Sequence, residues 1–215
     1  MITPLIIANF KSHMNLSEAL DWLSKIKSPQ NKTVIVLPPF TLLSFFKTQI
    51  QDKKLNLSLG AQNISPFAEG AFTGEINAKQ VKEFCDYVLI GHSERRKNFS
   101  EEDELLGKKV ALALENNLQP IFCVQGKETN VPKGVEIVAY EPIFAIGTGN
   151  PDTPENADSV ASAIKADRSD LTVLYGGSVK STNVRIFTEK PNIDGVLVGG
   201  ASLDPQEFSQ IIENA

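Results

Sequence analysis

The stretch from Val135 to Asn150 reads VEIVAYEPIFAIGTGN and joins two unlike halves. Its first half holds the run EIVAY, in which hydrophobic residues follow one another without strict alternation. Such a run is typical of a strand in a parallel sheet that is covered on both faces. The second half begins with a carboxylate, Glu141, followed by Pro142 and a loop with two glycines. Packing alone does not explain an acid at the end of a buried strand.

Runs of the same kind recur along the whole chain. The seven others are PLIIA from Pro4, TVIVL from Thr33, LSLGA from Leu57, YVLIG from Tyr87, PIFCV from Pro120, TVLYG from Thr172 and GVLVG from Gly195. Helical periodicity and helix start signals predict helices at Leu16–Lys27, Phe40–Ile50, Asn77–Phe84, Glu101–Asn116, Pro154–Ala166, Thr182–Glu189 and Pro205–Asn214. This alternation of strands and helices predicts a closed (β/α)8 barrel of parallel strands, with a doubly wound open sheet as the alternative.

One connection departs from the alternation. From Gln125 to Val135 the chain reads QGKETNVPKGV, with two glycines and one proline. Its length is near the lower limit for a parallel crossover and leaves no room for a packed helix. We therefore expect the helix between strands five and six to be absent. The outer face of these strands should be partly exposed, and covered by neighbouring helices, by loop side chains such as Val131 and Val135, or by another subunit.

Length, composition and charge limit the class of partner. The chain has 215 residues, 41% of them hydrophobic, which suits a single domain over residues 1–215. A net charge of −5 and the lack of a Lys/Arg cluster argue against nucleic acid, so we expect a small-molecule partner. The apolar run at the start is too short for a membrane span and lacks the features of a secretory signal. We expect no membrane association and a cytoplasmic location.

The cysteine pattern is equally plain. Cys85 and Cys123 are the two cysteines, and neither stands in a CxxC motif or in a Cys/His spacing. A disulfide framework and a zinc site are therefore both unsupported, and we interpret both residues as reduced packing residues. No cluster of metal ligands appears in the sequence.

Polar and glycine residues follow the predicted strands. The residues just past the strand ends are Asn9, Lys11, His92 to Glu94, Glu141, Gly176 to Ser178, Gly199 and Gly200. The C-terminal ends of the strands form the functional face of a parallel barrel. These side chains should therefore gather on one rim.

The motifs around these residues resemble those of the triosephosphate isomerase family. They are ANFK ending at Lys11, YVLIGHSERR from Tyr87, VAYEPIFAIGTGN from Val138, LYGGSV from Leu174 and GVLVGGASL from Gly195. The resemblance implies the family's α/β fold, the TIM barrel, and interconversion of dihydroxyacetone phosphate and glyceraldehyde 3-phosphate, a step of glycolysis and gluconeogenesis. It implies no metal and no organic cofactor.

The resemblance also implies roles for single residues. Glu141 would be the catalytic base, covered by the loop from Pro142 to Gly149, and His92 a neutral hydrogen-bond donor at a helix that Ser93 can cap. A glutamate base working with a neutral histidine is the known pattern of this very family, and the resemblance alone assigns it to these positions. Lys11 would supply positive charge for the phosphate and the developing oxyanion, with Asn9 holding the mouth.

The substrate phosphate would be held by Gly147, Ser178, Gly199 and Gly200, through the backbone amides of glycine-rich turns. Structural alternatives stay open at this point. Each glycine could be a turn residue with positive φ. Glu141 could cap a helix or form an ion pair, His92 could be a structural histidine, and Lys11 a solvated surface residue. Glu94 could orient Lys11 or pair with a neighbouring arginine, Arg95 or Arg96.

The segment GAQNISPFAEGAFTGEI, from Gly60 to Ile76, looks like the long third loop of the family. In the family this loop enters a groove of a second subunit, which implies a homodimer of the twofold kind through the residues from Gln62 to Glu75. Thr73 would reach the partner's active site near Asn9 and Lys11. Two rival functions remain: an isomerase of another phosphorylated sugar, and a phosphate-binding barrel that lost its activity with its helix.

Overall fold

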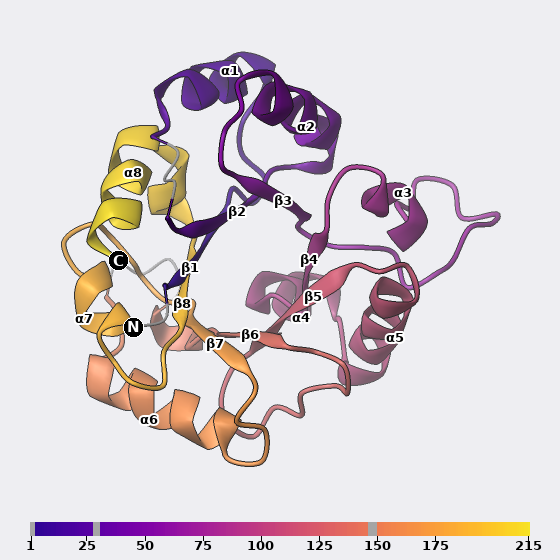
Figure 1. Ribbon diagram of the computed structural model, residues 1–215. Helices are drawn as coiled ribbons and strands as arrows, with labels where there is room; N and C mark the ends of the chain where they lie inside the picture. Colours follow the sequence, from indigo (N-terminus) through magenta and orange to yellow (C-terminus); the bar gives the residue numbers. More distant parts are fainter. Residues whose placement is uncertain (1–2, 28–30, 146–149) are drawn as a thin grey trace.

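The computed structural model describes residues 3–27, 31–145 and 150–215, and its centre is a closed barrel of eight parallel strands (Figure 1). The strands are β1 (Leu5–Asn9), β2 (Thr33–Leu37), β3 (Ser58–Ala61), β4 (Tyr87–Ile90), β5 (Gln119–Val124), β6 (Ile137–Tyr140), β7 (Thr172–Tyr175) and β8 (Gly195–Val198). Each strand pairs with the next in sequence, and β8 pairs with β1. Closure confirms the predicted barrel and excludes the open sheet.

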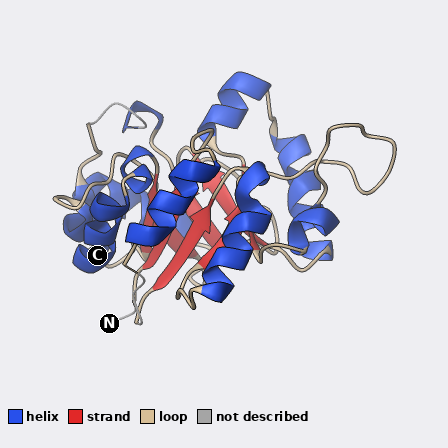
Figure 2. Cartoon of the chain, turned by 90° about the horizontal axis from the view of Figure 1, so that it is seen from above, coloured by secondary structure: helices blue, strands red, loops and turns tan. Residues whose placement is uncertain are grey.

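Helices surround the strands (Figure 2). They are α1 (Leu16–Lys25), α2 (Leu43–Asp52), α3 (Ala78–Lys82), α4 (Ser93–Phe99), α5 (Asp103–Glu115), α6 (Pro154–Lys165), α7 (Val184–Thr188) and α8 (Pro205–Asn214), with 3-10 turns η1 (Phe40–Leu42), η2 (Ile143–Ala145) and η3 (Gly200–Leu203). The predicted helices are found, although α3 and α7 are shorter than expected, and α4 lies ahead of α5 at the place where Ser93 was expected to cap a helix. Within the described ranges, none of the helices is long and apolar enough to cross a membrane.

Both faces of the strands are buried, which explains their near-continuous apolar sequences. Alternate side chains, such as Ile7, Leu89 and Leu174, fill the inside of the barrel. The intervening side chains point outward and form a larger core with the helices. The barrel is therefore a packed body, and the functional groups lie at its rim.

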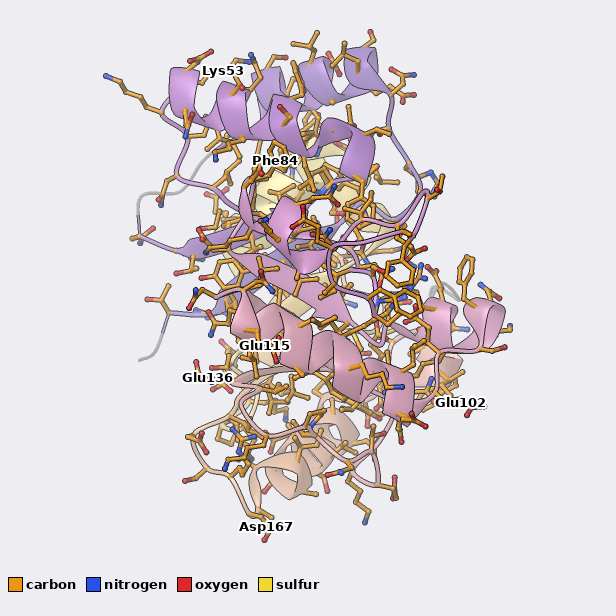
Figure 3. The ribbon with its side chains drawn as sticks, turned by 90° about the vertical axis from the view of Figure 1, so that its right-hand side faces the viewer. Lys53, Phe84, Glu102, Glu115, Glu136 and Asp167 are labelled. Atoms are coloured by element: carbon orange, nitrogen blue, oxygen red, sulfur yellow. The ribbon has the colours of Figure 1, made fainter. Side chains whose placement is uncertain are left out.

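The residues from 125 to 136, all of them described, form no helix, as predicted. Figure 3 shows this face toward the viewer, with α5 crossing it between the labels of Glu102, the residue before the helix, and Glu115, its last residue. Glu136 marks the residue before β6, and Asp167 follows the end of α6. The expected partial exposure of β5 and β6 is nevertheless wrong, because all of β6 and all of β5 except its first residue are buried.

The cover comes from the connection itself. The side chain of Val135 has no exposed surface, and Val131 packs against the outer core. Gly134 has a φ of 87° and lies so close to α5 that a Cβ there would come within 2.6 Å of Leu114. On the other side, Arg168 donates a hydrogen bond of 2.7 Å to the carbonyl of Val135. These contacts replace the missing helix.

Candidate active site

The end of β1 presents a lysine in a constrained backbone conformation. Lys11 has a φ of 52°, in the left-handed region that costs a non-glycine residue about 1–2 kcal/mol. The side-chain oxygen of Asn9, which is buried, accepts a 3.0 Å hydrogen bond from the Lys11 backbone N–H and holds this conformation. A Cβ on Gly199 would lie 3.3 Å from Lys11 Cε, so the lysine side chain crosses closely over the turn after β8.

Glu94 pairs with Lys11. Its Oε1 accepts a 2.7 Å hydrogen bond from Lys11 Nζ, whereas Arg95 pairs with Glu101 and Arg96 with Asp103. Partial burial acts to raise the pKa of Glu94, but the hydrogen bond and the charge of Lys11 outweigh it and leave that pKa below its ordinary value. Of the two alternatives for Glu94, the structure has the one that orients the lysine.

His92 is itself the N-cap of α4. Its Nδ1 accepts a 3.2 Å hydrogen bond from the backbone N–H of Glu94, so the expectation that Ser93 caps this helix is wrong. Because an accepting ring nitrogen carries no proton, the hydrogen of the neutral ring lies on Nε2. Nε2 stands 3.0 Å from Oε1 of Glu141. The imidazole is buried and therefore has one fixed orientation, with its donor toward the cavity.

Glu141 follows β6 and is 1% exposed. Its backbone N–H donates to the carbonyl of Val124, which continues the pairing with β5 past the end of the strand. Its Oε2 accepts a 2.8 Å hydrogen bond from the backbone N–H of Ser93, at the start of α4, where the helix dipole favours a negative charge. The acid at the end of the buried strand is thus held at the rim by a backbone amide and a histidine.

Cys123 is a neighbour of Glu141 that sequence reasoning treated only as packing. Burial raises the pKa of its thiol well above the ordinary value, and the charge of Glu141 and a hydrogen bond to it act in the same direction. The thiol is therefore a neutral donor beside the carboxylate. Its place could have been found from the alternation of β5, since Cys123 points into the barrel.

Of the side chains described above, four line one cavity of about 180 Å³: Asn9, Lys11, His92 and Glu141. Its lining consists of Asn9, Lys11, His92, Glu141, Gly176, Gly177, Ser178, Val179, Lys180, Leu197, Gly199, Gly200 and Ala201. Lys180 is a second cation at this cavity that the sequence analysis did not select. Glu94 acts from outside the cavity through Lys11, and Thr73 is exposed on its loop and is not among the lining residues. Gly147 lies outside the described residues.

The glycines of the rim allow neighbouring side chains to lie close to the backbone. Positive φ is found at Gly74, Gly91 and Gly134 among the described glycines, so the alternative that Gly199 and Gly200 need it is wrong. After β7 the approach is tight: a Cβ on Gly176 would lie 3.1 Å from Glu141 Cγ.

The turn after β7 is also tied to the turn after β6. A side chain at Gly177 would collide with the hydroxyl of Tyr175. The hydroxyl of Ser178 donates a 2.7 Å hydrogen bond to the carbonyl of Ala145 in η2. Among the described side chains, no group of three or more His, Cys, Asp or Glu residues is arranged to hold a metal ion.

A sequence profile described as triosephosphate isomerase matches residues 4–215. The chain belongs to the triosephosphate isomerase family. Similar proteins include the triosephosphate isomerases of Mesomycoplasma hyopneumoniae (strain 7448), at 39% identity, and of Aquifex aeolicus (strain VF5), at 37%. The first alignment covers 98% of this chain and 99% of the relative, and the second covers 97% and 98%. Family membership confirms the resemblance found in the motifs and the isomerase class of enzyme.

A third relative, the triosephosphate isomerase of Caldanaerobacter subterraneus subsp. tengcongensis, is 39% identical over 99% of each chain. Its alignment spans 248 positions, more than the 215 residues present here. This triosephosphate isomerase family member therefore lacks residues that the relative has, which agrees with the short connection between β5 and β6.

Proposed function

We propose that the protein interconverts dihydroxyacetone phosphate and D-glyceraldehyde 3-phosphate by moving a proton between adjacent carbon atoms. The observation that carries the proposal is the meeting of Lys11, His92 and Glu141 at one cavity, in a chain of the triosephosphate isomerase family. A C–H bond beside a carbonyl is weakly acidic. Breaking it needs a base within reach of the proton and donors aimed at the oxygen that gains charge.

Glu141 is the proposed base. It takes the proton from the carbon that bears the hydroxyl group, and the bonding electrons form the enediolate. The hydroxyl proton passes to the former carbonyl oxygen, and the protonated carboxyl returns a proton to the former carbonyl carbon. In this structure the carboxylate contacts Ser93 N–H and His92 Nε2. Substrate has to take over the histidine contact, and the carboxylate then turns into the cavity, where the missing side chain of Gly176 leaves it room.

His92 and Lys11 are the proposed partners of the substrate oxygens. The Nε2–H of the neutral imidazole would donate to the oxygen on which charge develops, because its other nitrogen is occupied by the helix backbone. The Lys11 ammonium, aimed by Glu94, would add positive charge at the same side of the cavity. Such preorganised donors commonly lower a barrier by several kcal/mol, about 3–4 for a single well-placed one.

For the phosphate we propose the turns after β7 and β8, with Ser178, Gly199 and Gly200, together with Gly147. Support comes from the glycines, whose lack of side chains lets an anion approach the backbone amides. The phosphate then lies next to Lys11, which closes over Gly199. No metal or organic cofactor enters this proposal.

Isomerisation in deuterated water tests the proton transfer. Because a protonated Glu141 exchanges with solvent, product isolated at early conversion should carry deuterium on the carbon that gained the proton. Product without any deuterium, even after complete conversion, would favour a direct hydride shift over the role proposed for Glu141. A folded protein that binds triose phosphate without converting it would instead favour the phosphate-binding barrel, and turnover of a different sugar phosphate alone would favour the other rival.

We also propose a twofold homodimer formed through the residues from Gln62 to Glu75. This loop stands away from the barrel (Figures 1 and 2). It carries Phe67 and Phe72, stacked with ring centroids 4.2 Å apart and yet 45% and 42% exposed. Two large apolar rings on a projecting loop are typical of a surface that a partner covers. Thr73, between Phe72 and Gly74, would then reach the active site of the partner.

A cytoplasmic location stays a prediction.

Sedimentation equilibrium tests the dimer. The wild type should show twice the chain mass, and Phe72→Asp should shift the equilibrium toward the monomer because it places a charge in the apolar contact. The matched control is Ile186→Asp on α7, where the side chain is 48% exposed. A wild type that stays monomeric at all concentrations would refute the proposal.

A further inference from the structure

A buried carboxylate outside the cavity is not used by the proposed mechanism. Asp152, just before α6, is 8% exposed. Its Oδ1 accepts a 2.8 Å hydrogen bond from the backbone N–H of Thr153, and its Oδ2 accepts one of 2.7 Å from the side chain of Asn156. The side chain of Thr153 caps α6, and the Asp152 carboxylate adds two further hydrogen bonds that hold the turn before the helix. A carboxylate is costly to bury, and hydrogen bonds from several donors offset that cost, so Asp152 is an integral part of the packed structure.

Two tyrosines complete the cluster. The hydroxyl of Tyr140 donates to Asp152 Oδ2 at 3.4 Å, and the backbone N–H of Asp152 donates to the hydroxyl of Tyr175 at 2.8 Å. Burial, and then the charge and hydrogen bond of Asp152, raise the pKa of Tyr140 to about 12. Both hydroxyls therefore keep their protons at neutral pH, since burial also raises the pKa of Tyr175 to about 12. The Asp152 carboxylate accepts from Tyr140, and the backbone N–H of the same residue donates to Tyr175, so Asp152 joins the two tyrosines.

The two tyrosines stand directly below the reacting rim. Tyr140 is the last residue of β6 and precedes Glu141, and Tyr175 is the last residue of β7 and precedes Gly176. The two are paired in register across the sheet. The ring of Tyr175 is fixed by stacking on Phe187, with centroids 4.0 Å apart. Its hydroxyl packs against Gly177, which leaves no space for a side chain there. A shift of Tyr140 would therefore move Glu141, whereas a shift of Tyr175 would move the turn that begins at Gly176.

We propose that Asp152 is a positioning residue that joins Tyr140 to Tyr175 and so fixes the distance between Glu141 and the phosphate turn from Gly176 to Ser178. Its carboxylate holds Tyr140 and locks the turn before α6, and the locked turn aims the Asp152 N–H at Tyr175. The inference rests on the proposed function, because it assumes that the base and the phosphate turn act on one molecule. It assigns to Asp152 no contact with substrate.

A pair of ligands separates positioning from stability. Phosphoglycolate carries a carboxylate at one end and a phosphate at the other, so it needs both halves of the site at the correct distance, whereas inorganic phosphate needs only the phosphate turn. Calorimetry should show that Asp152→Ala weakens phosphoglycolate binding about tenfold, while the affinity for inorganic phosphate stays within about twofold. In the isomerase assay kcat should fall by about the same factor, with KM changing less.

Three further variants complete the design. Asp152→Asn keeps the oxygen that accepts from Thr153, and its amide NH2 can donate to the Tyr140 hydroxyl, so it should restore part of the phosphoglycolate affinity. Tyr140→Phe removes a single hydroxyl and should give the same split at a smaller size, which keeps the test available should Asp152→Ala fail to fold. The control is Asp194→Ala: this carboxylate binds Val173 N–H and Lys165 at the other end of the barrel, so its loss should lower stability without splitting the two affinities.

The outcomes are distinguishable. Equal weakening of both ligands in Asp152→Ala, no weakening of either, or the same split in Asp194→Ala would overturn the positioning role while leaving the proposed function intact. A folded wild type that binds neither ligand and converts no triose phosphate would overturn the proposed function, and this inference with it.

Discussion

Replacing Val135 with alanine tests whether the short connection after β5 does the work of a helix. The side chain has no exposed surface, so the change removes two buried methyl groups. At about 0.8 kcal/mol for each group, plus a cavity term, the free energy of unfolding should fall by about 2 kcal/mol. For a chain of this size that corresponds to a loss of about 4–8 °C in melting temperature.

Thermal unfolding followed by circular dichroism at one fixed protein concentration measures the effect. Val131→Ala is the matched control, because this valine is only partly buried and should cost about half as much. The isomerase kcat at 25 °C should be unchanged in both variants, because Val135 and Glu141 lie at opposite ends of β6. A melting temperature within about 1 °C of the wild type for Val135→Ala would refute the reasoning, because it would mean that the connection does not pack.

Three further predictions concern the rim. Lys11→Met should lower kcat/KM by at least about a hundredfold, measured by steady-state kinetics, because it removes the ammonium at the cavity. In the folded protein the pKa of Glu94 lies below 4.5, so its pair with Lys11 should stabilise the fold at pH values above the unfolded-state pKa. This stabilisation should be lost as the pH falls through the folded-state pKa. The difference in unfolding free energy between wild type and Glu94→Gln, measured by urea denaturation, should be present at pH 7 and vanish in acid well below 4.5. Gly177→Ala should weaken the binding of inorganic phosphate, as seen by calorimetry, since its Cβ would displace the hydroxyl of Tyr175.

The strands were predictable because both of their faces are buried. A parallel barrel requires apolar residues at nearly every strand position, and the eight runs therefore stand out from the helices between them. Helix ends were less accurate. The segment from Thr182 to Glu189 has helical periodicity throughout, but its helix spans only Val184–Thr188, because the ends of a short helix depend on neighbouring segments.

The cover of β5 and β6 could not be predicted from the connection alone. Its valines were suggested, but burial of the strands also depends on Leu114 and Arg168, which come from elements on either side. Sequence separation hides such contacts, so the cover by Val131 and Val135 was expected but its completeness was not. The absence of the helix itself was predictable from length.

Much of the site was predictable from position. Residues after the strands of a parallel barrel meet at one rim, which brought Asn9, Lys11, His92 and Glu141 together. The helix cap was missed because serine is the usual capping residue, whereas here a histidine nitrogen takes that place. Asp152 was missed because a polar residue before a helix normally indicates a surface cap. Its proposed positioning role depends on contacts with Tyr140 of β6 and Tyr175 of β7.

The central claim is that Glu141 moves the proton. Its most direct test compares the isomerisation of glyceraldehyde 3-phosphate by the wild type, by Glu141→Gln and by Glu136→Gln, the same change in an exposed residue just before β6. We expect a fast wild type, an unchanged Glu136→Gln and a rate lower by about a hundredfold or more for Glu141→Gln. A folded wild type without activity, or a Glu141→Gln variant as fast as the wild type, would contradict the account.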